Sequence, residues 1–450
     1  MGVTAELCDK IVATTFDSLT PEAITKARRL VLDGIAVAVA GSREAAIGIL
    51  ADHYRSLGGT PDAAVLGLGF RTSATAAAVL NGASMHVLDF EPMWNPANHA
   101  LSTTLPAVLA LAESHNIAGR DLVAALGKGI ELAGWIRHAG HDGPIRFHPP
   151  GMVGPMGAAV AAGHVLGLDA GQLAHALGLA ASRAGGLTAN AGTMTKSTHC
   201  GQGVMLGLEA AMLVARGFTA NPEPFEAHQG YVHAFFTPDF QPRDLLNFGP
   251  PFRVVDPGYV IKLFPSQFAT QFVITAGLEL HRRIGDAKLI RAVRLVAPQM
   301  PYINRPRPST GLEGKFSVQY TLATALVRGL VNIDTFTDEA VRAPEIAAML
   351  DKISVEMVPH IPARFDLMHV EAEVELTDGR VVHTRCDGPR GMWGQPAISD
   401  AEHLVKVRDC LSKRLPPERM ERCIALARTI DTLDAAGVSE LLAIASVLEP

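Results

Sequence analysis

The sequence predicts a mainly α-helical protein, with a large all-helical domain and a smaller α+β domain. Hydrophobic residues make up 48% of the chain and aromatic residues only 6%, and 42 glycines accompany many alanine runs, which favours closely packed helices. Helical segments follow one another for more than 200 residues, whereas strand-like alternation is confined to a later stretch. A chain of 450 residues is longer than one hydrophobic core usually grows, so two domains are expected.

The helices are predicted from their start signals and their spacing of apolar residues. Thr20-Pro21-Glu22 joins a capping threonine, a proline at the first helical position and an acid in the first turn, and the apolar run that follows stops at Gly41. The segment His148–Leu168 has no formal charge, but prolines and histidines interrupt it, so we interpret it as a buried helix rather than a membrane span. The further helices are predicted near residues 43–57, 72–88, 102–115, 120–138, 153–167, 169–184, 198–216 and 222–236.

The strands are predicted after about residue 265. Residues 290–296 have the composition of a strand, and in 370–376 four apolar residues alternate strictly with three glutamates. Asp378-Gly379 then turns the chain into 381–384, giving a hairpin with one wet face and a helix such as 315–329 over the other. From about residue 400 the pattern is helical again. We therefore predict a discontinuous all-helical domain, residues 1–265 with 400–450, and an inserted α+β domain, residues 266–399.

Charge and cysteine usage exclude several classes of protein. The net charge is −6 and no basic stripe with interleaved aromatic residues occurs, so we expect no nucleic-acid partner. Five scattered cysteines without a CxxC pair argue against a disulfide framework and a thiolate metal site, and we expect no metal. The N-terminal segment is charged within its first turns, unlike a signal peptide, so we expect a cytoplasmic protein without a membrane partner.

Sequence motifs of several common enzymes are also missing. The chain has no GxxxxGK[ST], HExxH or GxSxG motif, which removes the usual signs of nucleotide, zinc-protease and α/β-hydrolase function. The segment 67–72 resembles a dinucleotide-binding loop, but Thr72 replaces the third glycine and no βαβ alternation follows.

The loop between Asn81 and Pro106 is the strongest sign of chemistry. It brings Asp89, Glu91, Trp94, Asn95 and His99 together within eleven residues, and proton transfer requires such titratable groups at hydrogen-bond range. The alternative interpretation is a polar connection between helices, with Asp89 as a cap.

Two further segments carry candidate residues for an anionic ligand. Arg146 and His148 precede an uncharged helix, whose free N–H groups favour an anion, although a histidine beside prolines is often structural. In the segment 190–201, Lys196 and His199 share one helix face, and hydroxyl groups such as that of Thr195 flank them. A lysine in so apolar a segment needs an anionic partner, the alternative being a solvated lysine at a capped helix start.

Two residues lie near the predicted boundary between the domains. Lys262 stands inside an apolar run there, and small-ligand sites form in clefts between domains. Tyr320 lies in the first turns of a helix within the second domain, from which it could reach across such a cleft or serve as a core residue.

Taken together, these segments resemble the MmgE/PrpD family over nearly the whole chain. The motifs that carry the resemblance are NG…H.LDF at 81–90, W.P..H at 94–99, FHP....G at 147–154, GTMTK..H.G at 192–201, K.FP at 262–265 and FS..Y at 316–320. The resemblance implies a helical domain with an α+β lid domain, a homodimer, and a cofactor-free site for a small carboxylate in the cleft. The positions that match family active-site residues are Asp89, His99, His148, Lys196, Lys262 and Tyr320, and we expect substrate contacts from Trp94, Arg146, Thr195 and His199.

The sequence departs from the family pattern in places that concern the substrate. Glu91-Pro92-Met93 replaces the usual Asp-Asp-Thr or Asp-Asp-Ser, Ala100-Leu101 replaces Pro-Ser, and Gln271 stands where a histidine is common. Trp94, Pro96 and the triplet 148–150 are closer to the decarboxylase branch.

We hypothesise that Lys196 and Lys262 clamp the carboxylates of a di- or tricarboxylate. His99 or His148 would then act as the base, with Asp89 orienting it. We expect a dehydratase first. The same site could also perform decarboxylation or epimerisation, or bind a carboxylate without catalysis.

Overall fold

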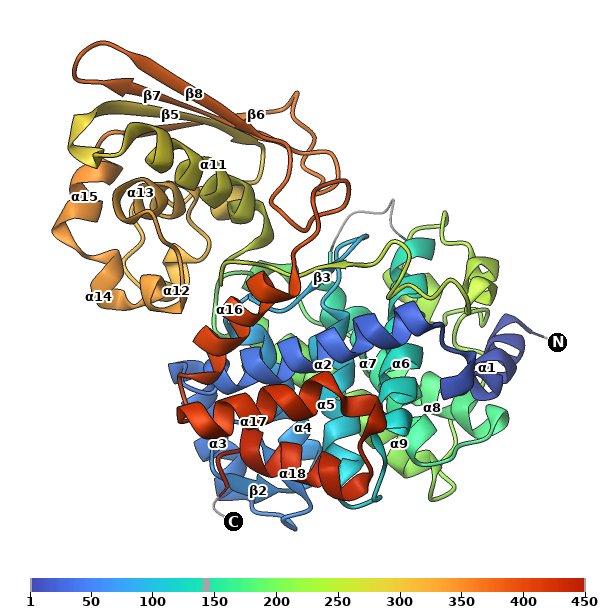
Figure 1. The fold of residues 1–450 in the computed structure, drawn as a ribbon. Helices are drawn as coiled ribbons and strands as arrows, with labels where there is room; N and C mark the ends of the chain where they lie inside the picture. Colours follow the sequence, from blue (N-terminus) through green and yellow to red (C-terminus); the bar gives the residue numbers. More distant parts are fainter. Residues whose placement is uncertain (1, 141–145, 449–450) are drawn as a thin grey trace.

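The computed structural model describes residues 2–140 and 146–448, and most of these residues form a bundle of helices, the helical part (Figure 1). Two short sheets accompany the bundle, β1 (Ala63–Val65) with β2 (Phe70–Thr72) and β3 (Met93–Trp94) with β4 (Tyr259–Val260). The helices of this part are α1 (Val3–Ala13), α2 (Pro21–Gly41), α3 (Ala45–Leu57), α4 (Ala74–Val87), α5 (Ala100–Ala112), α6 (Gly119–Ala139), α7 (Pro149–Val165), α8 (Ala170–Arg183), α9 (Thr195–Val214), α10 (Tyr231–Phe235), α16 (Asp400–Leu411), α17 (Pro417–Arg428) and α18 (Ala435–Ala445).

The remaining elements form a four-stranded sheet covered by helices, the sheet part (Figure 1). The strand order is β6-β5-β7-β8, with β5 parallel to β6 and the other neighbours antiparallel. Helices α11 and α13 pack against each other and cover one face of the sheet. The elements are α11 (Phe268–Ile284), β5 (Ile290–Pro298), α12 (Gly311–Gly314), α13 (Val318–Arg328), α14 (Asp338–Val341), α15 (Pro344–Leu350), β6 (Ile353–Val358), β7 (Val370–Leu376) and β8 (Val381–Cys386).

The prediction of a mainly α-helical fold with a smaller α+β portion is confirmed. In β7 the apolar residues are buried while Glu373 is exposed, as its alternation predicts. The helix predicted over 222–236 is reduced to α10, because Pro222 and Pro224 disfavour helix at its start. Strand β6 was not predicted, since it is an edge strand in which residues 353–357 alternate only between half-buried and exposed, and Val358 alone is buried.

The C-terminal helices return to the helical part after the sheet part is complete. Helices α16 and α17 pack against α2, and α18 contacts α2 and α5 (Figure 1). Their side chains join the core of the helical part, whereas the buried residues of the sheet and of α11 and α13 form a separate core. Within the ranges that the structure describes, no single helix is long and apolar enough to cross a membrane; α2 and α3 pass that test only as a pair bent by 86°.

Two glycines allow α4 and α9 to approach closely at the centre of the bundle. A Cβ on Gly201 would lie 2.4 Å from the carbonyl oxygen of Val79, and one on Gly82 would lie 3.1 Å from Cα of Gly201. Only glycine permits backbones this close. The contact places the end of α4, with His86, beside the start of α9, with Lys196 and His199.

Asp33 connects α2 to α16 in the interior of the helical part. Its carboxylate accepts hydrogen bonds from His403 Nε2 at 2.9 Å and from Lys406 Nζ at 3.1 Å, and all three side chains are buried. Lys406 also donates to the carbonyl oxygen of Phe90 at 2.7 Å. Helix α16 thus supports the turn that follows α4.

We predict that Asp33→Ala destabilises the protein by about 3–5 kcal/mol, because it leaves the Lys406 ammonium buried without its counter-charge. Urea unfolding followed by circular dichroism measures this loss. The control is Glu421→Ala, which breaks the exposed pair with Arg408 between α16 and α17 and should leave the midpoint unchanged. Equal midpoints for Asp33→Ala and the wild type would contradict the prediction.

Candidate active site

A cavity of about 680 Å³ lies between the helical part and the sheet part. Its polar lining comes mostly from the helical part and its apolar lining mostly from the sheet part. The volume is within the range of small-molecule sites. The lining residues from the helical part include Asp89, Met93, His99, Arg137, His148 and Lys196. Those from the sheet part and the segment before it include Gln267, Phe268, Met300, Tyr302, Phe316, Arg364, Phe365 and Asp366.

Asp89 lies between two lysines at the inner end of the cavity. Lys196 donates to Oδ2 at 2.7 Å, and Lys262 donates to Oδ1 and, at 2.9 Å, to the carbonyl oxygen of Asp89. Asp89 has a φ of +51°, a left-handed conformation that aspartate tolerates better than most residues. Burial alone would raise the pKa of this carboxyl, but the two ammonium groups hold it well below its usual range.

The carboxylate of Glu91 contacts two imidazoles in the interior of the site. His86 Nδ1 is hydrogen-bonded to Oε1, His99 Nδ1 lies 2.9 Å from the same oxygen, and the Ser102 hydroxyl donates to it at 3.2 Å. Lys196 Nζ donates to His86 Nε2 at 2.8 Å, so the proton of this ring is on Nδ1. On His99 the contact to Glu91 leaves Nε2 as the nitrogen available for a ligand.

His148 and His199 form a second imidazole pair. Their Nδ1 atoms lie 3.1 Å apart, so one ring donates and the other accepts. His148 caps the start of α7 and lines the cavity, whereas His199 lies on α9 behind it. The His148 ring is also close to His86 and His99, at centroid distances of 5.5 and 6.0 Å.

The four imidazoles are neutral near pH 7. Burial lowers the pKa of His86 to about 4, and the positive charge of Lys196 adds to this effect. Burial also lowers the pKa of His99, His148 and His199, with Lys196 contributing in each case. Neutral imidazoles can accept a proton, and the pKa of such a group rises when an anion binds beside it.

Two models of one known protein family match this chain over most of its length. The model of the MmgE/PrpD N-terminal domain matches residues 5–243, and that of the MmgE/PrpD C-terminal domain matches residues 264–432. The chain belongs to the MmgE/PrpD family. The resemblance found in the sequence motifs is thereby confirmed.

Similar curated proteins extend over nearly the whole of this MmgE/PrpD chain. It is 30% identical to the cis-aconitate decarboxylases of Mus musculus and of Homo sapiens, in each case over 97% of this chain, and over 92% and 93% of those proteins. It is 26% identical to a cis-aconitate decarboxylase of Aspergillus terreus, over 98% of this chain and 96% of that protein.

Four of the predicted active-site residues line the cavity of this MmgE/PrpD protein, Asp89, His99, His148 and Lys196, and Asn95 of the same loop lines it as well. His199 lies directly behind them. Lys262 belongs to the same cluster but has a different place from the one we expected. Its side chain is buried beneath Asp89 and does not face the cavity, so it holds Asp89 rather than a substrate carboxylate.

Four other predicted site residues lie outside the main cavity. Tyr320 is buried in the sheet part, where its hydroxyl donates to the Thr335 carbonyl, because its helix face packs into that core. Trp94 is buried against Tyr259 in the helical core. Thr195 begins α9 on its exposed side, one residue before Lys196 turns inward.

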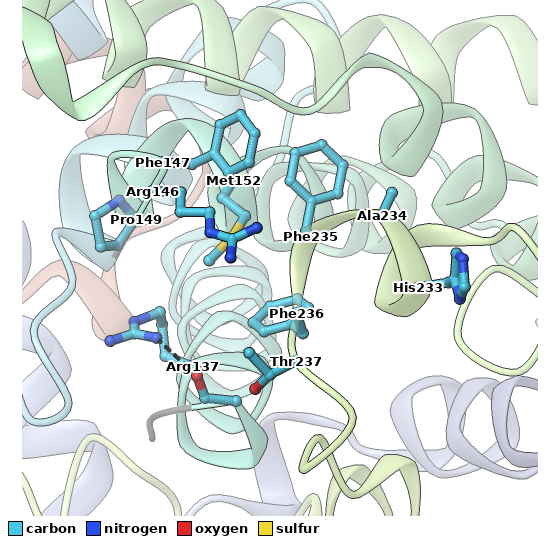
Figure 2. A pocket seen from close by; sticks show the side chains of 11 residues that line it. Arg137, Arg146, Phe147, Pro149, Met152, His233, Ala234, Phe235, Phe236 and Thr237 are labelled. Carbon is cyan, nitrogen blue, oxygen red and sulfur yellow. Dashed lines mark hydrogen bonds between the residues drawn. The ribbon is translucent and has the colours of Figure 1, made fainter. Parts of the chain in front are cut away.

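Arg146 also lies outside the main cavity. Because α7 begins at Pro149, His148 turns inward while Arg146 stays exposed two residues earlier. It lines a smaller cavity of about 110 Å³, together with Arg137, Phe235 and Phe236 (Figure 2).

Sequence reasoning also missed residues that the fold brings to the site. His86 lies in the motif at 81–90 but has no predicted role, and Glu91 is predicted only as one of the titratable groups of its loop, without a partner. Arg137 and Tyr302 carry no local signal, since each is a single polar residue within an otherwise ordinary segment. Gln271 instead binds the backbone of Phe264 and Ser266, and the neighbouring Gln267 faces the cavity.

The donor set suits proton transfer better than a metal ion. Among the described residues, His86, His99 and His148, then His86, Glu91 and Cys200, and then Asp89, Glu91 and His99 bring possible ligand atoms within 4.8 Å of one another. Lysines already occupy both oxygens of Asp89 and Nε2 of His86. A cation there would be repelled by two ammonium groups.

We predict that stability falls as the pH drops from 6.5 toward 4. Unfolded histidines take up protons near pH 6.5, but the buried imidazoles have lowered pKa values and stay neutral in the folded state. Each such group costs up to about 1.4 kcal/mol per pH unit in this window. Urea unfolding at pH 7.5, 6.0 and 5.0 measures the slope.

His148→Gln should make this slope shallower, and His360→Gln, which removes an exposed histidine, should not change it. A slope identical in His148→Gln and wild type would contradict the assignment of a buried neutral imidazole. The lowered pKa of Asp89 adds a separate loss only below about pH 4.

Proposed function

We propose that this chain is a carboxy-lyase that decarboxylates an unsaturated tricarboxylate of the cis-aconitate type. The observation that carries the proposal is the composition of the cavity, which joins Lys196, His99 and His148 from the helical part to apolar side chains from the sheet part. The similar proteins are named as cis-aconitate decarboxylases, which favours this reaction over the dehydration first expected from the sequence. The coarser assignment, a lyase of this family, does not depend on that choice.

The apolar wall suits the loss of carbon dioxide. Phe268, Met300, Phe316 and Phe365 line the cavity from the sheet part, and the Phe316 ring centroid lies 5.7 Å from Lys196 Nζ. A carboxylate held against such side chains loses hydration, whereas the neutral carbon dioxide that it becomes does not need any.

The reaction balances with one proton. The bond between the methylene carbon and its carboxylate breaks, and its electron pair forms the new carbon–carbon double bond. The electrons of the original double bond move to the carbon beside a second carboxylate, and that carbon takes up a proton. The products are carbon dioxide and a methylidene dicarboxylate, and the developing negative charge is stabilised by the Lys196 ammonium.

His99 and His148 are the proposed proton donors. Both are neutral in the free protein, and a bound carboxylate raises the pKa of a neighbouring imidazole because it favours the charged form. Substrate binding therefore charges the group that delivers the proton. Glu91 fixes the His99 ring through Nδ1, which directs Nε2 to the ligand.

The proposal predicts that purified protein converts cis-aconitate into a methylidene dicarboxylate and carbon dioxide. In D₂O, proton NMR would show new methylidene signals and one deuterium at the protonated carbon, since the proton comes from an exchangeable imidazole. Citrate formed from cis-aconitate would instead identify a hydratase, and α-deuterium exchange without products an epimerase.

We predict that Lys196→Ala lowers kcat/KM about 100-fold or more, the scale found when one group that stabilises transition-state charge is removed. Steady-state assays of carbon dioxide release measure it, with thermal unfolding to establish that the variant is folded. Lys288→Ala, which removes a lysine from the 3-10 turn before β5, is the control and should retain wild-type kinetics. Wild-type activity in Lys196→Ala would overturn the role of Lys196.

A further inference from the structure

The charged residues that line the main cavity do not balance. Asp89 is paired with Lys196, and Asp366 is paired with Arg364. Arg137 is the remaining cation among the described lining residues, and no described carboxylate lies within ion-pair distance of it. The cavity therefore carries a surplus positive charge at a position separate from the Asp89 cluster.

Among the described residues, Arg137 donates hydrogen bonds only to backbone oxygens. Its Nε donates to the carbonyl oxygen of Ala97 at 3.2 Å, and Nη1 donates to that of Gly140 at 3.5 Å (Figure 2). Its Nη2 has no hydrogen-bond acceptor in the described chain. The side chain is 5% exposed and lies on the wall shared by the main cavity and the smaller one.

A buried guanidinium at the wall of a cavity favours the binding of an anion. Burial lowers the pKa of Arg137 to about 10, so it remains charged at neutral pH, with no carboxylate of residues 2–140 and 146–448 as its counter-ion. An unpaired buried charge is costly to a protein, and a bound carboxylate removes the cost through charge-assisted hydrogen bonds. Carbonyl contacts on two of its nitrogens fix the plane of the group before the ligand arrives.

We propose that Arg137 binds a carboxylate of the ligand other than the one at Lys196, and thereby makes the site selective for tricarboxylates over dicarboxylates. This inference rests on the proposed function, since it concerns recognition of the same substrate. Lys196 and the imidazoles act on the reacting portion of the ligand, whereas Arg137 fixes its orientation from α6.

The test measures binding rather than turnover. Isothermal titration calorimetry compares tricarballylate, a saturated tricarboxylate, with methylsuccinate, which has the same carbon skeleton without one terminal carboxylate. The wild type should bind tricarballylate more tightly. Arg137→Gln should reduce this preference about 10- to 100-fold, the value of one hydrogen-bonded charge pair.

Arg120→Gln provides the control, because it removes an arginine from the exposed start of the same helix. This variant should keep the wild-type preference. Arg137→Lys retains the charge but not the planar fork, so its preference should fall between those of the wild type and Arg137→Gln.

A preference unchanged in Arg137→Gln, with the variant folded by circular dichroism, would overturn the proposal, as would a wild type that binds both acids equally. The proposed function is tested by a different result. If cis-aconitate is not decarboxylated but the tricarboxylate preference depends on Arg137, the proposed binding site is supported and the proposed reaction is wrong.

Discussion

The buried carboxylate of Asp89, with an ammonium group on each of its oxygens, is the contact on which the site depends. Lys262 holds it from beneath, and Lys196 approaches it from the cavity. Because Lys196 also donates to His86, its position fixes the proton of that ring on the side of Glu91. Glu91 in turn meets His99, so a single ion cluster sets the protonation of the groups around it.

The helical part and the sheet part contribute different kinds of side chain to the cavity. The helical part supplies charge from the ends of α4 and α9, which the glycine contact between Gly82 and Gly201 brings together. The sheet part supplies apolar side chains, among them Phe268, Met300 and Phe365, to the same cavity. Electrostatic interactions are stronger beside side chains of low polarity than in water, so neither part could form the proposed catalytic environment alone.

The sequence was sufficient for features that depend on local pattern or on a motif. The alternation of β7 predicted its buried face, and the order of motifs placed Asp89, His99, His148 and Lys196 at one site. It was not sufficient where packing decides the outcome. Whether Tyr320 faces the cavity or its own core depends on which side of α13 is covered, and both choices suit an amphipathic helix.

The same limit explains the difference between the two lysines and the late recognition of Arg137. Lys196 and Lys262 have similar apolar neighbours in sequence, but only the fold places one above the Asp89 carboxylate and the other below it. Arg137 becomes notable only when the other charges in the cavity are seen to be paired. A balance of charges is a property of three-dimensional neighbours, not of sequence spacing.

The bond between Asp33 and Lys406 joins residues 373 positions apart. During synthesis, α2 leaves the ribosome long before α16 is translated. Asp33 can therefore pair with Lys406 only after the sheet part and then α16 have been synthesised. Contacts of such high sequence separation form late because the chain entropy of closing the loop must be overcome first. The nascent helical bundle therefore remains open along α2 until the last helices emerge, and a ribosome-bound chain ending before residue 400 would expose apolar surface that chaperones recognise.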